Sequence, residues 1–145
     1  MISIKVEGVE KARSSIQALP AEVQRLVILR LSQIAFDSAQ KYAGRHTKTG
    51  ALFRSTYNRA IPGGREVGHD PKLAPHAAFV HWGTKPHKIR PKNRKALRWP
   101  NGGGFRFAKS VNHPGYKGDA WMIRAADDAV RQFTSVVQGA FKDAQ

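Results

Sequence analysis

Cysteine is absent from the 145 residues of this chain, and carboxylates are scarce. Without cysteine the chain can form no disulfide, thiolate zinc site, iron–sulfur cluster or cysteine nucleophile, and nothing marks it for an oxidising compartment. Its longest strongly apolar run, Leu26 to Leu31, is much shorter than the roughly 20 residues that span a membrane. The opening residues MISIKVEGVEK lack the continuous apolar stretch of a secretory signal. We therefore expect a protein made in the cytoplasm, with neither a membrane span nor an export signal.

The composition is otherwise that of a folded protein with an unusual charge. The hydrophobic fraction is 41% and the charged fraction is 24%, which are ordinary values for a globular domain. The length fits a single domain, residues 1–145. Lys and Arg number 25 against 10 Asp and Glu, so the formal net charge is +15. This excess of positive charge favours an anionic partner.

The first part of the sequence shows the patterns of one strand and two helices. Apolar and polar residues alternate over 2–6, which predicts a short strand. Apolar residues at helical spacing predict helices over 9–19 and 21–43, separated by Pro20. The broad apolar face of the second helix is expected to face the core and holds Val23, Val27, Leu31, Ile34, Ala35 and Tyr42.

A second apolar stripe runs along the opposite side of that helix. It consists of Leu26, Leu29 and Phe36, which lie among polar residues. Another element of the same domain could cover it. Because exposed apolar patches often mark interfaces, the alternative is a contact between subunits, for which these three residues are the candidates.

The middle of the chain is rich in turns. We expect a short helix over 51–57 capped by Thr49, and a hairpin of two strands within 58–70. A further short helix is expected to open at Pro75 and to end at Gly83 in the left-handed conformation.

A second hairpin and a long helix complete the prediction. Residues 95–99 and 105–111 flank the loop PNGGG, and their alternation predicts a hairpin with one apolar and one basic face. Residues 119–141 predict one amphipathic helix, whose apolar face holds Met122, Ala126, Ala129, Val130, Phe133, Val136, Val137, Ala140 and Phe141. The expected fold is α+β, with helices packed on one face of a small antiparallel sheet and a protruding basic hairpin or loop excursion at about 85–117.

Positive charge is concentrated in one stretch of the sequence. No acidic residue occurs between Asp70 and Asp119, whereas Lys and Arg recur throughout. Such a stretch repels itself, which favours contact with a polyanion or an acidic protein over a merely solvated surface. The arginines suit bidentate phosphate contacts and the lysines serve as point charges. The candidate contact residues are Lys85, Lys88, Arg90, Lys92, Arg94, Lys95, Arg98, Arg106 and Lys109.

Signatures of catalysis are weak. The sequence has no GxSxG, P-loop, GxGxxG or HExxH motif, and no carboxylate accompanies the histidines of the basic stretch as a metal nuclease would require. We expect no catalytic residue, no metal and no cofactor. A small metal-independent ribonuclease that uses His81, His87, Arg90 and His113 stays open as an alternative, as does a nucleic-acid-binding protein that ignores base sequence.

Three short segments in order resemble a known family. They are TGALFRS at 49–55, AFVHWGT at 78–84 and DAWMIRAA at 119–126, the last followed by the terminal helix. Together they are similar to the HK-ninety-seven gene-product-ten-like family of long-tailed bacteriophages, whose members are small virion proteins of the neck and tail. The segment at 120–125 lacks the two prolines typical of the family, and the basic insertion is long.

The resemblance implies a structural role without catalysis. It implies a tail-completion or head-to-tail connector protein, located in the virion and assembled as a ring of several copies, with six as the expected number. The implied partners are further copies of the chain, other neck and tail proteins and, without sequence preference, packaged DNA. The basic hairpin would face either that DNA or an acidic surface of the neighbouring ring.

Overall fold

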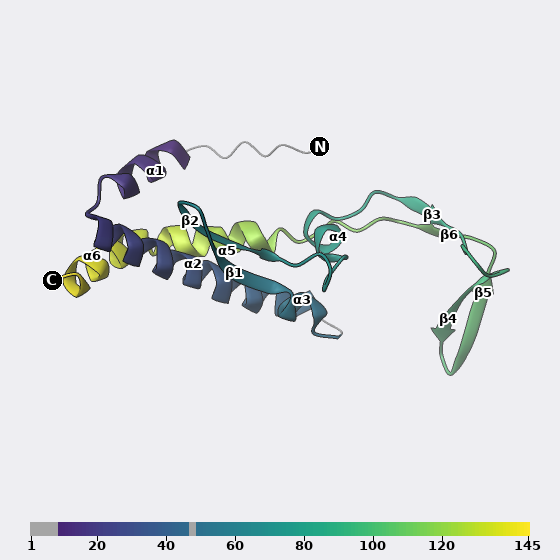
Figure 1. Ribbon diagram of the computed structural model, residues 1–145. Helices are drawn as coiled ribbons and strands as arrows, with labels where there is room; N and C mark the ends of the chain where they lie inside the picture. Colours follow the sequence, from purple (N-terminus) through teal and green to yellow (C-terminus); the bar gives the residue numbers. More distant parts are fainter. Residues whose placement is uncertain (1–8, 47–48) are drawn as a thin grey trace. The chain divides into compact units, whose positions relative to one another are not determined.

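The computed structural model describes residues 9–46 and 49–145 of the chain (Figure 1). The strand predicted over 2–6 lies outside the described residues. The chain divides into two units, which we treat separately. The helical unit is the described part of Met1–Pro75 together with Trp121–Gln145, and the basic unit is His76–Ala120. The excursion expected at 85–117 falls within the basic unit.

The α+β class predicted from the sequence is confirmed. The helical unit contains α1 (Val9–Gln17), α2 (Ala21–Ala43), the 3₁₀ turn η1 (Gly44–His46), α3 (Ala51–Arg54), β1 (Thr56–Ile61), β2 (Gly64–His69), α5 (Trp121–Arg131) and α6 (Phe133–Asp143). The basic unit contains α4 (Ala77–Trp82), β3 (His87–Ile89), β4 (Leu97–Asn101), β5 (Gly104–Ala108) and β6 (Val111–His113). The described strands form separate antiparallel pairs, β1 with β2, β3 with β6 and β4 with β5, and no larger sheet joins them.

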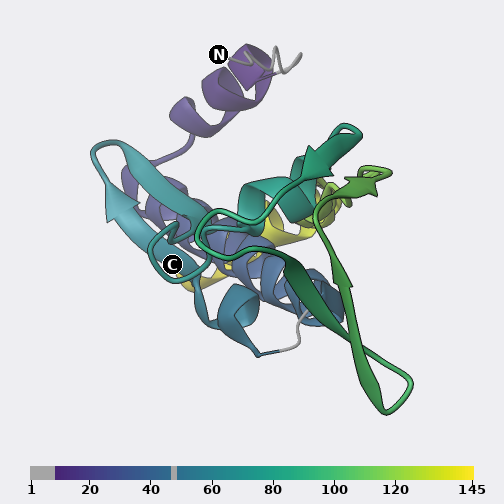
Figure 2. The ribbon, with the colours of Figure 1, turned by 90° about the vertical axis from the view of Figure 1, so that its right-hand side faces the viewer.

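Helix α2 is the element around which the helical unit packs, and its predicted bounds are confirmed. Helices α5 and α6 and the β1–β2 hairpin all lie against it (Figures 1 and 2). Pro20 precedes the helix with φ −53° and ψ 144°, an extended conformation that ends α1 and starts α2. In the hairpin Ile61 pairs with Gly64, and Gly63 takes a φ of +77° in the turn after Pro62.

The core of the helical unit combines β-branched residues at one end of α2 with alanines at the other. Val23 and Val27 form a buried cluster with Val136 and Ala140 of α6. Toward its C-terminal end α2 buries Ala39 and Ala43, while α5 buries Trp121, Ala125 and Ala129. Of the predicted α2 core face, Leu31, Ile34, Ala35 and Tyr42 are half-buried. The alanines let the two helix backbones approach closely, which a face of larger residues would prevent.

Two polar links join the helices to neighbouring elements. The Tyr42 hydroxyl donates a hydrogen bond to the Asp128 carboxylate at 2.8 Å, and this bond, followed by one from Ser38, holds the pKa of Asp128 below its ordinary value. The fully buried Trp121 donates its indole N–H to Nε2 of His69 at 2.9 Å. These bonds connect α5 to α2 and to the end of β2.

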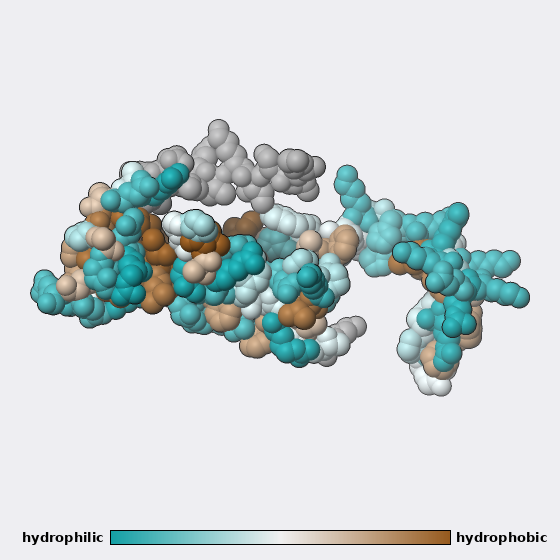
Figure 3. Space-filling model, in the orientation of Figure 1, coloured by the Kyte–Doolittle hydropathy of each residue, from teal (hydrophilic) through white to brown (hydrophobic). Residues whose placement is uncertain are grey.

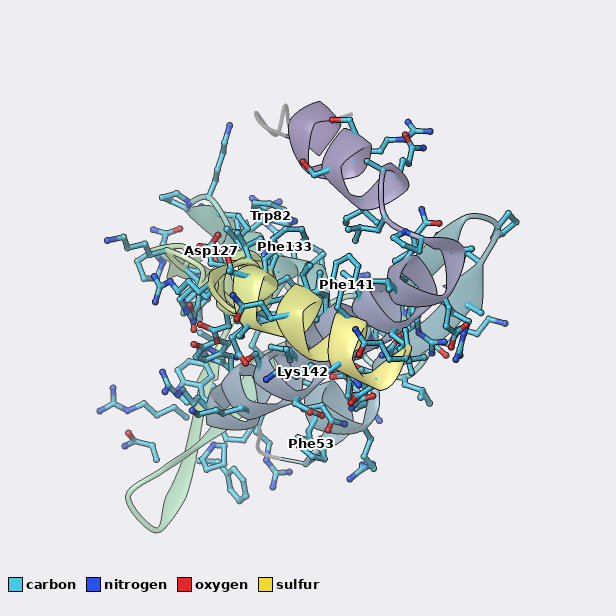
Figure 4. All side chains as sticks on the ribbon, turned by 90° about the vertical axis from the view of Figure 1, so that its left-hand side faces the viewer. Phe53, Trp82, Asp127, Phe133, Phe141 and Lys142 are labelled. Atoms are coloured by element: carbon cyan, nitrogen blue, oxygen red, sulfur yellow. The ribbon has the colours of Figure 1, made fainter. Side chains whose placement is uncertain are left out.

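The C-terminal region differs from its prediction of one helix over 119–141. The helix starts at Trp121 and is interrupted at Gln132, whose N–H bonds to the Ala129 carbonyl three residues back. The buried residues Trp121, Ala125 and Ala129 of α5 and Val136 and Ala140 of α6 are four or seven residues apart, so both helices turn the same buried side toward α2. Phe133 and Phe141 lie along α6 (Figure 4).

The predicted apolar face of this region is therefore only partly covered. Ala126 is exposed and Val130 is 70% exposed. They line an open groove of about 730 Å³ together with Ile16, Ile28, Leu31, Ala35, Val67 and Phe133.

Smaller boundary errors have local causes. The helix expected over 51–57 ends at Arg54, because the chain pairs as β1 from Thr56 onward. Its N-cap is Gly50 with φ +75°, although the Thr49 hydroxyl still accepts the Ala51 N–H at 3.4 Å. Helix α1 ends at Gln17, two residues before the predicted end. Helix α4 begins at Ala77, two residues after Pro75.

The contact between α2 and α5 gives a stability prediction. Ala125→Leu adds three carbons to a position that is 1% exposed, so we expect the free energy of unfolding to fall by about 1–3 kcal/mol. Ala126→Leu is the matched control, because the next residue of the same helix is exposed and should change stability by less than about 0.5 kcal/mol. Urea denaturation followed by circular dichroism measures both variants, and equal losses would contradict this packing.

Candidate functional site

The basic unit carries the charge imbalance seen in the sequence. Its 45 residues hold ten Lys and Arg, and Asp119 is its single carboxylate. All nine predicted contact residues are exposed. In the helical unit, by contrast, several carboxylates have cationic partners: Glu22 pairs with Arg25, Glu66 with Arg59 and Asp143 with Arg30. The excess of cations over carboxylates is therefore greatest in the basic unit.

Close backbone contacts join the first and last segments of the basic unit, near α4. Thr84 and Tyr116 exchange backbone hydrogen bonds of 2.8 and 2.9 Å, and the Asp119 N–H bonds to the Val80 carbonyl at 2.9 Å. These bonds join the segment after α4 to the segment that leads out of the unit. The two segments approach so closely that a Cβ atom on Gly118 would lie 2.5 Å from the Gly83 nitrogen.

We call the place where these two segments meet the glycine crossing. Glycine is required there because a Cβ atom would clash with the neighbouring backbone and because the φ values are positive. Gly83, Gly115 and Gly118 all have φ values between +78° and +89°. Gly83 differs from its prediction: it has a positive φ of +82° but an extended ψ of −175°, so it is not left-handed helical. The extended ψ directs the chain into the bridge with Tyr116, whereas a left-handed cap would turn it back over α4.

The β3–β6 pair brings two of the singled-out histidines together. His87 and His113 are register partners, and their rings stack with centroids 5.0 Å apart and planes inclined at 26°. His87 Nδ1 lies 2.8 Å from the Lys85 carbonyl, which requires the proton on Nδ1 and leaves Nε2 as an acceptor. His113 Nδ1 accepts the Gly115 N–H at 3.0 Å, which places its proton on Nε2.

The β4–β5 ribbon has a tighter turn than the PNGGG loop suggested. Asn101 pairs with Gly104, so only Gly102 and Gly103 connect the strands. Both have positive φ, +53° and +88°, as a type I′ turn requires. Figure 2 shows the ribbon closed by this turn.

The register of the ribbon contradicts the prediction of one apolar and one basic face. Trp99 is paired with Arg106, and Arg98 is paired with Phe107. Directly opposed residues of an antiparallel pair lie on the same face, so one face combines Arg98 with Phe105 and Phe107, and the other combines Arg106 with Trp99. Within each strand, apolar and basic residues alternate as predicted. The pairing of the two strands, however, is shifted by one residue from the register that would place all apolar side chains on one face and all basic side chains on the other.

Cations and rings meet at two places on the ribbon. The Arg98 guanidinium lies 3.6 Å from the centroid of the Phe105 ring, a cation–π contact. Arg98 also lines a hollow of about 580 Å³, which we call the cationic hollow. It is lined by Pro91, Lys92, Arg94, Ala96, Leu97, Arg98 and Phe107. Phe107 is 66% exposed and is therefore open to a ligand.

The basic unit has almost no core of its own. His81 is its one buried residue, at 8% exposure. Large apolar side chains lie instead on its surface among the cations, as Figure 3 shows for the region of β3 to β6. Two-stranded ribbons without a packed face are marginally stable in isolation, so this surface is suited to being covered by another molecule.

The other candidate residues of the sequence are dispersed. Leu26 packs partly against the α2–α6 cluster, Phe36 is half-buried, and Leu29 is 44% exposed. Of the ribonuclease candidates the structure brings together His87 and His113, while His81 is buried beside Trp82.

A buried Ser–His pair in the helical unit is a structural link. Ser55 Oγ and His69 Nδ1 are 3.0 Å apart. Because His69 Nε2 accepts the Trp121 N–H, the proton lies on Nδ1, and the Ser55 hydroxyl donates to the Leu52 carbonyl. The imidazole is thus in the wrong tautomer to serve as a base toward Ser55.

Across residues 9–46 and 49–145 no three His, Asp or Glu side chains gather in a way that could hold a metal ion. Among the helices of the same described ranges, none has the length and apolar character needed to cross a bilayer.

Comparison of the chain with known protein families, with curated proteins and with solved structures finds no match.

The glycine crossing yields a prediction about the basic unit. Gly118→Ala would place a methyl group against the backbone of Trp82 and Gly83 at a φ of +78°, so we expect amide hydrogen exchange at Thr84, Tyr116 and Asp119 to accelerate by about tenfold or more. Exchange in α2 should not change. Gly104→Ala is the control, because that position has no close neighbour; the same acceleration there would refute the role of the crossing.

Proposed function

We propose that this chain is a non-enzymatic assembly protein of a long-tailed bacteriophage, acting as a tail-completion or head-to-tail connector component. Its basic unit docks on an anionic surface, and its helical unit contacts neighbouring copies in a ring. The observation that carries the docking role is the surface of the basic unit, which exposes many cations and several aromatic rings and buries only His81. The resemblance of the three sequence segments supports the phage neck as the location.

The charge of the two units decides what kind of molecule the basic unit can meet. The basic unit carries ten cations and one carboxylate, and the rest of the sequence carries 15 cations and nine carboxylates. Both units are thus net positive, and one copy cannot neutralise another. Assembly into a ring would increase the repulsion, so the complementary charge has to come from a different molecule.

The helical unit offers an apolar surface for contact between copies. Leu29 is exposed on α2, and the open groove lined by Val130 and Phe133 is apolar except for Arg65 and a few hydroxyl groups. Neighbouring copies in a closed ring meet through unlike patches, and apolar area supplies most of the free energy of such contacts. Leu29 and the groove are our candidates for one of these patches.

The assembly role can be tested in the phage that carries the gene. Deletion of the gene should yield DNA-filled heads and separate tails in electron micrographs. Leu29→Ser should reproduce this failure and reduce self-association of the purified chain by about tenfold in light scattering, since it removes apolar contact area. Gln33→Ser, one turn away on the exposed side of α2, is the matched control. Complete particles from the deletion phage would refute the proposal.

The stacked histidines favour one second candidate, a metal-independent ribonuclease. His87 presents an acceptor at Nε2 and His113 a donor at Nε2, the two roles needed for transfer of a proton to and from a phosphodiester.

This candidate predicts cleavage of single-stranded RNA in the presence of EDTA. His87→Ala and His113→Ala should each abolish the activity, because each removes one of the two proton-transfer groups. His76→Ala removes an exposed histidine of the same unit and should leave the activity unchanged. Wild-type protein that leaves the RNA intact would eliminate this function.

A further inference from the structure

The cationic hollow combines features that identify a class of ligand. Lys92, Arg94 and Arg98 supply three positive charges, and the Phe107 ring supplies an exposed apolar face beside them. A volume of about 580 Å³ exceeds what a bare phosphate would fill. Polynucleotides match this combination of cations and an aromatic ring, since each nucleotide joins a negatively charged phosphate to a flat base.

The register of the β4–β5 ribbon distinguishes nucleic acid from an acidic protein. A protein interface needs a central patch depleted of charge, and neither face of the ribbon provides one, because each face sets an arginine beside its aromatic side chains. A flexible strand can instead follow a ribbon around both faces. Its phosphates would meet Arg98 on one face and Arg106 on the other.

The rings distinguish unpaired bases from a duplex. Arg98 already covers a face of Phe105 at 3.6 Å, whereas Phe107 on the same face of the ribbon is largely exposed. An exposed ring can stack only on a base that is not already stacked and paired within a double helix. Aromatic side chains set among cations therefore suit a single strand better than a closed double helix.

From these observations we propose that the cationic hollow and the β4–β5 ribbon bind single-stranded nucleic acid without sequence preference. Bases stack on Phe107, and phosphates contact Lys92, Arg94 and Arg98. This inference rests on the proposed function in one respect, that the basic unit is a docking surface, and it names the partner as an unpaired polynucleotide strand.

The test measures binding of the full chain to a fluorescein-labelled thymidine 20-mer by anisotropy. Phe107→Ala should weaken binding by about tenfold or more without any change of charge. Phe79→Ala removes a ring that is equally exposed in the same unit but lies outside the hollow, and it should stay within about twofold of wild type. Phe107→Tyr should retain binding, which separates loss of the ring from loss of the ribbon.

Charge is tested by the salt dependence of the same measurement. Arg94→Ala combined with Arg98→Ala should reduce the slope of log affinity against log salt by about 1.4, the value for two phosphate contacts with a single strand. Lys109→Ala combined with Lys117→Ala removes the same charge from exposed positions outside the hollow, and should reduce the slope by less.

Three outcomes would overturn the inference. They are equal loss of affinity in Phe107→Ala and Phe79→Ala, a duplex of 20 base pairs bound as tightly as the single strand, or polyglutamate competing as well as the single strand at equal charge. The last would indicate an acidic protein partner. None of these bears on whether heads and tails join in the deletion phage, so the two proposals fail separately.

Discussion

Repulsion among the cations of the basic unit is the constraint on which the rest of the structure depends. Ten positive side chains share 45 residues with one carboxylate, and the unit buries only His81. Such a unit has too few carboxylates to neutralise its cations and no core in which to bury its aromatic side chains. Backbone pairing holds it together instead, through the β3–β6 and β4–β5 ladders and the Thr84–Tyr116 bridge. Exposed side chains such as Lys92, Arg94 and Phe107 are not needed for this backbone pairing.

The helical unit is stabilised in the opposite way. Its interior is made of valines, alanines and Trp121, and its main carboxylates bond to groups of the same unit, such as Asp128 to Tyr42 and Glu66 to Tyr57 and Arg59. Hydrogen bonds from Tyr57, followed by those from Arg59, hold the pKa of Glu66 below its ordinary value. The helical unit therefore pairs several of its carboxylates within itself, whereas the single carboxylate of the basic unit cannot balance its ten cations.

A structural role and a binding role are compatible on one chain of this kind. The proposed contact between copies would use apolar area such as Leu29, and the proposed contact with a polyanion would use Arg94, Arg98 and their neighbours, so the two surfaces have different chemistry. Salt weakens the second strongly and the first little.

The sequence by itself determined the elements whose signal is local. Pro20 separated α1 from α2, the pattern around Pro62 and Gly63 predicted the β1–β2 hairpin, and the charge count located the basic unit. Tertiary structure alone decided the pairing of β3 with β6, the stacking of His87 on His113 and the register that mixes cations with rings on both faces of the β4–β5 ribbon. It also decided the break at Gln132. The physical reason is that periodicity reports one strand or helix at a time, whereas register and helix phase are set by partners distant in sequence.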